Sequence, residues 1–390
     1  MLGGGYSRRL ERAAGLLVLT GTLAGGSAAG WAQSIFVPPP PPPPTPTAPP
    51  PPVVTVTPEI VVVQPTTQDN SFRQDTIRSL ARGTIGTLRS QANATTDGVF
   101  DRLRSVTRGL AASATGGTGP TPPGGTVTLE EFSSIQPFDY AGLAAGSPGT
   151  RWGLWGDASG SFLRNNTPVG FDGTSELALT GLDYLADANW VFGLTSGYTH
   201  ADLSLTPSSV RRSVNGAVVG PYAAYVINPN VAIDALVNYT SLDNRLAAPA
   251  PLAGGGYHSN RVTGATELDF FGDYGGMKLT GFGGYAFSWE GGNPGAIVGN
   301  ALANNVRYGA IRVGGEAAYP VGAFEPYVPL TFEYETTNPN DGTSRTALVV
   351  GAGLRYRWSE TLTGGLLAET TEVKTHARDI RVGANVRWSF

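Results

Sequence analysis

The last twelve residues of the chain alternate strictly between two kinds of side chain. One parity holds Ile380, Val382, Ala384, Val386, Trp388 and Phe390, and the other holds Asp379, Arg381, Gly383, Asn385, Arg387 and Ser389. Successive side chains of a β-strand point to opposite faces, so this segment predicts a strand with one apolar and one polar face. In a soluble sandwich the apolar face would meet a second sheet. In a transmembrane barrel it meets lipid, and the polar face lines the lumen.

The same alternation recurs upstream, and it predicts twelve strands in all. They are placed at 151–164, 173–187, 190–205, 211–227, 231–246, 257–274, 277–290, 305–320, 323–337, 343–358, 361–376 and 378–390. A tilted strand needs roughly nine to eleven residues to cross a membrane, so each segment is long enough. With an even number of strands, the start of the first strand and the end of the last strand lie on the same, periplasmic side of the membrane, as short periplasmic turns require.

The polar face of these strands carries charge, which separates a barrel from a sandwich. A sandwich core would have to bury several unpaired charges, at a high cost in free energy, whereas a polar lumen accepts them. The predicted fold is therefore all-β, a 12-stranded antiparallel transmembrane β-barrel over residues 151–390. The candidates for lumen-facing charges are Asp234, Arg312, Glu316, Glu333, Glu335, Arg355 and Arg357.

The N-terminal segment 1–32 has the pattern of a secretory signal peptide. Arg8, Arg9 and Arg12 precede an apolar stretch at 16–23, and small residues follow. Cleavage is predicted after Ala32, which leaves Gln33 as the mature start. The arginine pair also fits twin-arginine export, but that route moves folded cargo and a barrel folds only in its membrane, so Sec-dependent export is expected. No later run approaches 18 apolar residues, so an integral protein would have to be a closed barrel.

Three regions separate the signal peptide from the barrel. Residues 33–68 hold many of the chain's 30 prolines, which favours a disordered polyproline spacer or a vestigial passenger over a ligand for an aromatic groove. Residues 69–113 predict a helical linker. Residues 114–150, rich in Gly, Pro and Thr at their start, predict a flexible connection.

The predicted helix has one apolar side and carries excess positive charge. Its apolar residues recur every three or four positions, and its seven arginines outnumber its four aspartates, a local charge of about +3. Glycines 83, 86 and 98 weaken the helix and leave open whether it is one piece or two. A solvent-exposed amphipathic helix, a short coiled coil and a helix inside an acidic lumen all fit this pattern.

Several kinds of function lack support in the sequence. With no cysteine there is neither a disulfide framework nor a thiolate metal site, and the three histidines are scattered without ligand spacing. A net charge of -4 argues against nucleic acid as a partner. No nucleophile lies in a catalytic motif and no glycine-rich phosphate loop is evident, so neither an enzyme nor a cofactor is expected.

The order of these elements resembles the autotransporter family of type V secretion, over roughly residues 130–390. The residues that carry the resemblance are 151–156 (RWGLWG), 181–183 (GLD), 193–198, 326–330 (PYVPL) and 386–390 (VRWSF). The resemblance implies an outer-membrane translocator domain, exported by Sec and inserted by the barrel assembly machinery. It implies that Val386, Trp388 and Phe390 form the barrel assembly signal.

The resemblance also implies that the linker helix threads the lumen and that a passenger upstream reaches the cell surface. Twelve strands leave room for about one helix. The barrel region has 16 basic and 21 acidic residues, about -5, opposite in sign to the helix. Between residues 33 and 69 there is no sizeable passenger, so the expected function is a translocator with a very short or vestigial passenger. The alternative is an outer-membrane pore or structural barrel with a periplasmic Pro-rich arm.

Overall fold

The computed structural model describes residues 67–114, 151–206, 208–248, 254–292, 305–337, 343–359, 361–372 and 374–390. The predicted signal peptide with its cleavage position at Ala32 and Gln33, nearly all of the Pro-rich segment and the connection before the barrel lie outside these ranges. Contacts divide the chain into Met1–Asn70 and Ser71–Phe390. The contacts reported below belong to the second unit.

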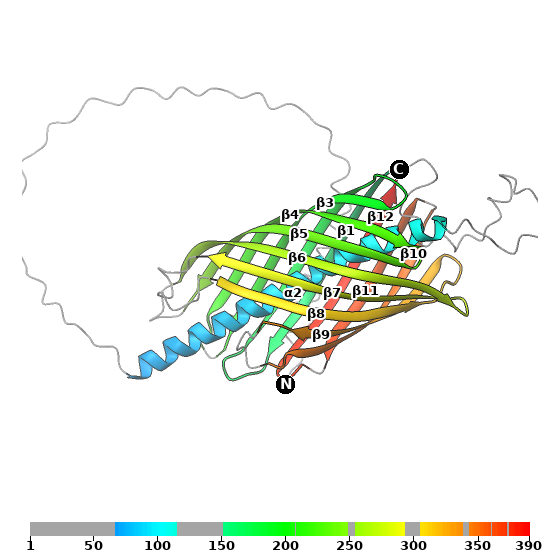
Figure 1. Cartoon of the computed structure of the whole chain (residues 1–390). Coiled ribbons are helices and arrows are strands. Elements are labelled where there is room, and N and C mark those ends of the chain that lie inside the picture. Colours follow the sequence, from blue (N-terminus) through cyan, green and yellow to red (C-terminus); the bar gives the residue numbers. More distant parts are fainter. Residues whose placement is uncertain are drawn as a thin grey trace, which may run out of the picture. The chain divides into compact units, whose positions relative to one another are not determined.

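Twelve antiparallel strands form one closed barrel, so the predicted fold is confirmed (Figure 1). Each strand pairs with its neighbours in sequence, and β1 pairs with β12 from Gly153↔Ser389 to Asn165↔Ala377. The strands are β1 (Trp152–Asn165), β2 (Phe171–Leu185), β3 (Trp190–Leu205), β4 (Arg211–Asn228), β5 (Val231–Ala247), β6 (Gly255–Tyr274), β7 (Met277–Gly292), β8 (Asn305–Ala318), β9 (Phe324–Glu335), β10 (Thr346–Arg357), β11 (Leu362–Glu372) and β12 (Ala377–Ser389).

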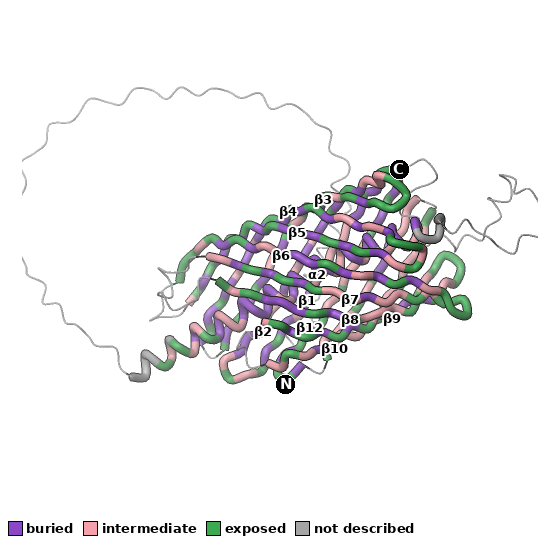
Figure 2. The backbone as a smooth tube through the Cα atoms, in the orientation of Figure 1, coloured by how far each residue is buried: buried purple, intermediate pink, exposed green. Residues whose placement is uncertain are grey.

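Buried and more exposed residues alternate along most of the strands (Figure 2), as on β5. On β9, Phe332 is 48% exposed, whereas its neighbour Glu333 is only 2% exposed. Large apolar side chains on the other strands are likewise exposed on the outer surface, while charged ones such as Asp234, Glu267 and Arg312 are buried inside. A surface of this kind is stable only against lipid, because in water so much exposed apolar area would drive association.

The two ends of the barrel differ in the length of their connections. At the end where β2 meets β3, the connections hold two to five residues, and we call it the short-turn end. One of the two shortest, between β6 and β7, needs Gly275 and Gly276, whose φ angles are +59° and +81°. At the other end, the long-loop end, connections reach twelve residues between β7 and β8. Long loops alternating with short turns are typical of outer-membrane barrels.

One helix, α2 (Thr67–Ala114), precedes the barrel and runs through its interior (Figure 1). It is continuous, so the glycines that predicted a weak point do not break it. They lie where the helix backbone approaches the wall: a Cβ on Gly86 would lie 2.2 Å from Cζ of Phe171, and one on Gly83 would lie 3.0 Å from Cδ1 of Leu203. Phe171 itself opens β2, two residues earlier than predicted, and its ring is buried beneath the helix.

Among the described residues, no helix is both long enough and apolar enough to cross a membrane.

Candidate functional site

The lumen and the helix inside it form the candidate site, and one side of α2 is apolar. Leu80 packs against Phe171, Leu203 and neighbouring apolar side chains near the long-loop end. Farther along, Val99, Leu103 and other helix residues pack against apolar side chains that come mainly from β1 to β5. Fully burying such a side chain contributes about 1.5–3 kcal/mol. This packing seats the helix against one half of the wall.

Polar contacts fix the other side of α2. Nη1 of Arg89 lies 3.0 Å from Oε1 of Glu335 on β9, and Nδ2 of Asn93 donates to Oε1 of Glu333 at 2.9 Å. Asp97 forms an ion pair with Arg312 on β8 at 2.7 Å and another with Arg381 on β12. These contacts pair Arg89, Asn93 and Asp97 of the helix with residues on β8, β9 and β12 of the wall.

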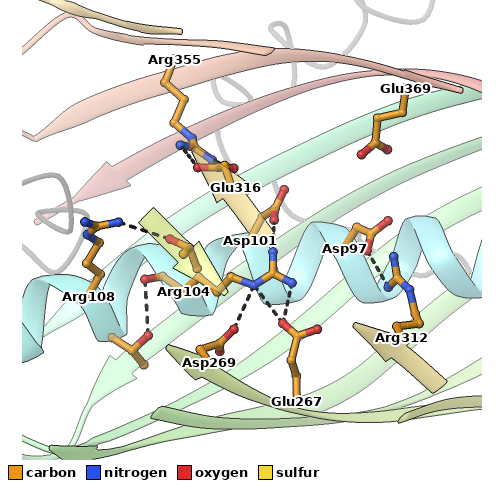
Figure 3. A network of polar contacts seen from close by, with 12 residues as sticks. Asp97, Asp101, Arg104, Arg108, Glu267, Asp269, Arg312, Glu316, Arg355 and Glu369 are labelled. Carbon is orange, nitrogen blue, oxygen red and sulfur yellow. Dashed lines mark hydrogen bonds and ion pairs between the residues drawn. The ribbon is translucent and has the colours of Figure 1, made fainter. Parts of the chain in front are cut away.

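Arg104 is the most highly connected cation of the helix (Figure 3). Its Nε lies 2.8 Å from Oε1 of Glu267 and 3.1 Å from Oδ1 of Asp269, both on β6. Its Nη1 also contacts Asp101, one turn back, at 2.6 Å, and its guanidinium lies 4.3 Å from the ring centre of Phe282. One arginine therefore serves three carboxylates and one aromatic face.

A second buried ion pair holds the opposite side of the helix. Arg102 contacts Asp183 on β2, and both side chains are at most 5% exposed. Tyr222 donates its hydroxyl hydrogen to the same carboxylate, and Nε1 of Trp155 donates to the tyrosine oxygen at 2.7 Å. Arg102 and Arg104 thus tie α2 to β2 and to β6, which fixes its position along the lumen.

The structure brings together most of the charged residues that the sequence singled out. Arg355 contacts Glu316 at 2.6 Å, Arg312 contacts Glu333 at 3.1 Å, and Glu335 contacts Lys374 and Arg89. Asp234, which is fully buried, lies on β5 beside the carboxylates of β6 instead. Arg357 is half-buried on β10, on the same face as Arg355.

Several charged residues of the lumen were not singled out from the sequence: Asp183, Arg212, Arg261, Glu267, Asp269 and Glu290. Each has the parity of the polar face of its strand, so extending the alternation rule to every predicted strand would have found them. Val386, Trp388 and Phe390 lie on the outer surface, each between 47% and 49% exposed. The backbone nitrogen of Phe390 donates to the carbonyl of Trp152 at 3.2 Å, across the β1–β12 seam.

α2 leaves part of the lumen unfilled. A cavity of about 80 Å³ lies between the helix and the wall formed by β7 to β12, toward the short-turn end. Its lining is strongly charged and includes Arg104, Lys278, Glu316, Arg355 and Arg387. Its size and polarity suit several water molecules. Within the described ranges, no three His, Cys, Asp or Glu side chains are placed to hold a metal ion.

A transmembrane barrel with its own upstream helix in the lumen is the class of protein that this geometry defines. The family model "autotransporter beta-domain" matches residues 154–369, more than half of the chain. The chain therefore belongs to the autotransporter family, and its twelve-stranded barrel is an outer-membrane β-barrel translocator domain. No curated protein matches the chain.

Two solved translocator structures have the same fold. The β-domain of the Bordetella autotransporter Brka is 17% identical, with a TM-score of 0.52, and the match covers 62% of this chain and 100% of that one. The translocator domain of the autotransporter NalP from Neisseria meningitidis is 13% identical, with a TM-score of 0.53, over 64% of this chain and 92% of that one. At these identities the likeness concerns the fold alone.

The buried pair Arg102–Asp183 predicts a large effect of one substitution. Arg102→Met would leave the Asp183 carboxylate buried without a cation, which costs about 3–5 kcal/mol. We expect amide hydrogen exchange near position 102 of α2 to accelerate accordingly, because local opening becomes easier. Adding Asp183→Asn should restore part of the protection.

Arg108→Met is the matched control. Its partner Asp273 has a side chain that is 75% exposed, so the loss should be below about 1 kcal/mol. Equal acceleration of exchange in Arg102→Met and Arg108→Met would contradict the assigned role of the buried pair.

Proposed function

We propose that this translocator domain carries the segment upstream of α2 to the cell surface and then retains α2 as a plug. The transported segment is the short Pro-rich region, which acts as a very short or vestigial passenger. The barrel is exported by Sec and inserted by the barrel assembly machinery. We assign no catalytic step to it.

The direction of α2 in the lumen supports this proposal. Near its N-terminal end, Ser79 donates to the carbonyl of Gly170 at 2.6 Å, and Arg82 donates to Oγ1 of Thr167 at 2.9 Å. Both partners lie at the long-loop end. Near its C-terminal end, Arg108 contacts Asp273 at 2.7 Å, at the short-turn end. In outer-membrane barrels the long loops face the exterior, so the chain upstream of α2 would leave on that side.

The alternative, a pore or structural barrel with a periplasmic Pro-rich arm, requires the upstream segment to lie at the short-turn end. The observed direction of α2 favours the translocator over this alternative. The two functions therefore differ in one measurable quantity, the side of the membrane on which the Pro-rich segment lies.

Single-cysteine labelling on intact cells tests the proposal directly, because the chain has no cysteine of its own. We expect Thr55→Cys, in the Pro-rich segment, to react with a membrane-impermeant maleimide before the outer membrane is permeabilised. His258→Cys, exposed at the long-loop end, is the positive control, and Ala188→Cys, exposed at the short-turn end, is the negative control. Labelling of Thr55→Cys only after permeabilisation would establish the periplasmic arm instead.

The proposed assembly signal, Val386, Trp388 and Phe390, has a separate test. We expect Phe390→Ser to lower the amount of heat-modifiable, folded barrel in the outer membrane several-fold. Phe324→Ser is the matched control, because Phe324 is an outward aromatic of equal exposure, 49% against 48%. If Phe390→Ser and Phe324→Ser give equal amounts of folded barrel in the outer membrane, Phe390 has no specific role as a recognition signal.

A further inference from the structure

Eleven carboxylates of the lumen wall fall into two groups, to neither of which Asp157 on β1 and Asp379 on β12 belong. In the first group, each carboxylate has a cation supplied by the wall itself. Examples are Glu333 with Arg312 at 3.1 Å and Glu316 with Arg355 at 2.6 Å. The full group is Glu290, Glu316, Glu325, Glu333, Glu335 and Glu369, paired with Arg212, Arg261, Lys278, Arg312, Arg355, Lys374 and Arg381. These six carboxylates and seven cations form their ion pairs within the wall, so they keep them whether or not α2 is present, with one positive charge in excess.

The second group has no cation from the wall, and we call its members the α2-dependent carboxylates: Asp183, Asp234, Glu267, Asp269 and Asp273. Among the described residues, every ion pair that they form is with Arg102, Arg104 or Arg108 of α2. Figure 3 shows Arg104 reaching both Glu267 and Asp269.

Asp234 is the extreme member of this group. It is 0% exposed, and neither of its carboxylate oxygens has a hydrogen-bond partner among the described residues. Its backbone is directly opposite that of Glu267 in the sheet. Asn238, four residues along the same face of β5, is also fully buried with both side-chain polar atoms unpartnered. The wall here is built to face positive charge, and α2 supplies only part of it.

Withdrawal of α2 would therefore change the lumen unevenly. The first group keeps its wall cations, with one positive charge in excess, but the loss of three arginines leaves five carboxylates behind. An aqueous channel lined by uncompensated carboxylates concentrates cations and excludes anions.

We propose that the lumen without α2 is a cation-selective pore, and that the α2-dependent carboxylates set its selectivity. This inference rests on the proposed role of α2 as a plug. It adds an activity, selective conduction of small cations, and it names the side chains responsible. Arg102, Arg104 and Arg108 occupy this cation path when α2 is in place.

The test starts from the full-length folded protein, so that the barrel assembles with its helix. A protease site is inserted between Gly124 and Gly125, the purified protein is cut, and α2 is washed out at high salt with its loss verified by mass spectrometry. Planar-bilayer recordings in a KCl gradient then give two independent readings. Conductance reports whether the lumen has opened, and the reversal potential reports the permeability of K⁺ relative to Cl⁻.

We expect conductance to rise and K⁺ to permeate several-fold better than Cl⁻. Asp234→Asn/Glu267→Gln/Asp269→Asn should bring the permeability ratio close to one. Asp273→Asn, at a side chain that is 75% exposed and so places little demand on folding, should shift it in the same direction. The matched control is Asp172→Asn/Glu176→Gln/Asp202→Asn, which removes the same charge from the outward face of β2 and β3 and should leave the ratio unchanged.

The outcomes separate the two proposals. The inference is overturned if the open pore prefers Cl⁻, does not discriminate between K⁺ and Cl⁻, or keeps its selectivity in the Asp273→Asn variant. In each of these cases the proposed role of α2 as a plug still stands. Conductance that stays low after α2 has been lost contradicts the plug, and the inference falls with it.

Discussion

The closure of the sheet is the constraint on which the rest of this structure depends. Within lipid an unpaired backbone group costs several kilocalories per mole, so a membrane-spanning sheet cannot have open edges. Here the hydrogen bonds between β1 and β12 complete the ring. Once the ring is closed, the two faces of each strand have different solvents. Lipid selects the apolar outer face, and the enclosed lumen receives most of the buried charged side chains that the strands carry, such as Asp234, Glu267 and Arg312.

A closed ring of twelve strands creates an interior that its own side chains do not fill, and α2 occupies that space. The helix does so with two different sides. Its apolar residues pack mainly against β1 to β5, as Val99 and Leu103 do. Four of its charged side chains, Arg89, Asp97, Arg104 and Arg108, reach β6 to β12. Glycines at 83 and 86 let its backbone come close to Leu203 and Phe171. The helix therefore fits this lumen by shape as well as by charge.

The charge pattern also explains why the helix is so rich in arginine. The wall satisfies some of its carboxylates itself, as with Glu333 and Arg312, and leaves others to the helix, as with Asp183 and Arg102. Burying such pairs costs desolvation, so they add less to stability than their number suggests. They are better understood as fixing position: a helix shifted by one turn would leave both a buried arginine and a buried carboxylate without partners.

Much of this fold could be predicted from the sequence because strand alternation is local. Phe390 and its same-parity neighbours indicated an outward face, and the same rule gave twelve strands. Partnerships could not be predicted in this way, because they depend on register and on the axial position of the helix. Arg381 meets Asp97 across 284 positions of sequence. Helix propensity is also a local property, so Gly86 predicted a weak point in the helix. Its actual role is to let the helix backbone lie close to the ring of Phe171, and that contact depends on the tertiary structure.

The central claim, that α2 lies inside the barrel at a fixed axial position, is tested most directly by a disulfide between helix and wall. A Cβ on Gly98 would lie 3.3 Å from Cγ of Asp157 on β1, so Gly98→Cys/Asp157→Cys places two thiols within bonding reach. In a chain with no other cysteine, oxidation of the folded protein in membranes should link them quantitatively, as read by mass spectrometry of the digest. Gly98→Cys/Gly160→Cys, with the second thiol on the outer face of β1, should stay unlinked. Equal linkage of the two pairs, or none in the first, would contradict a helix held at this position in the lumen.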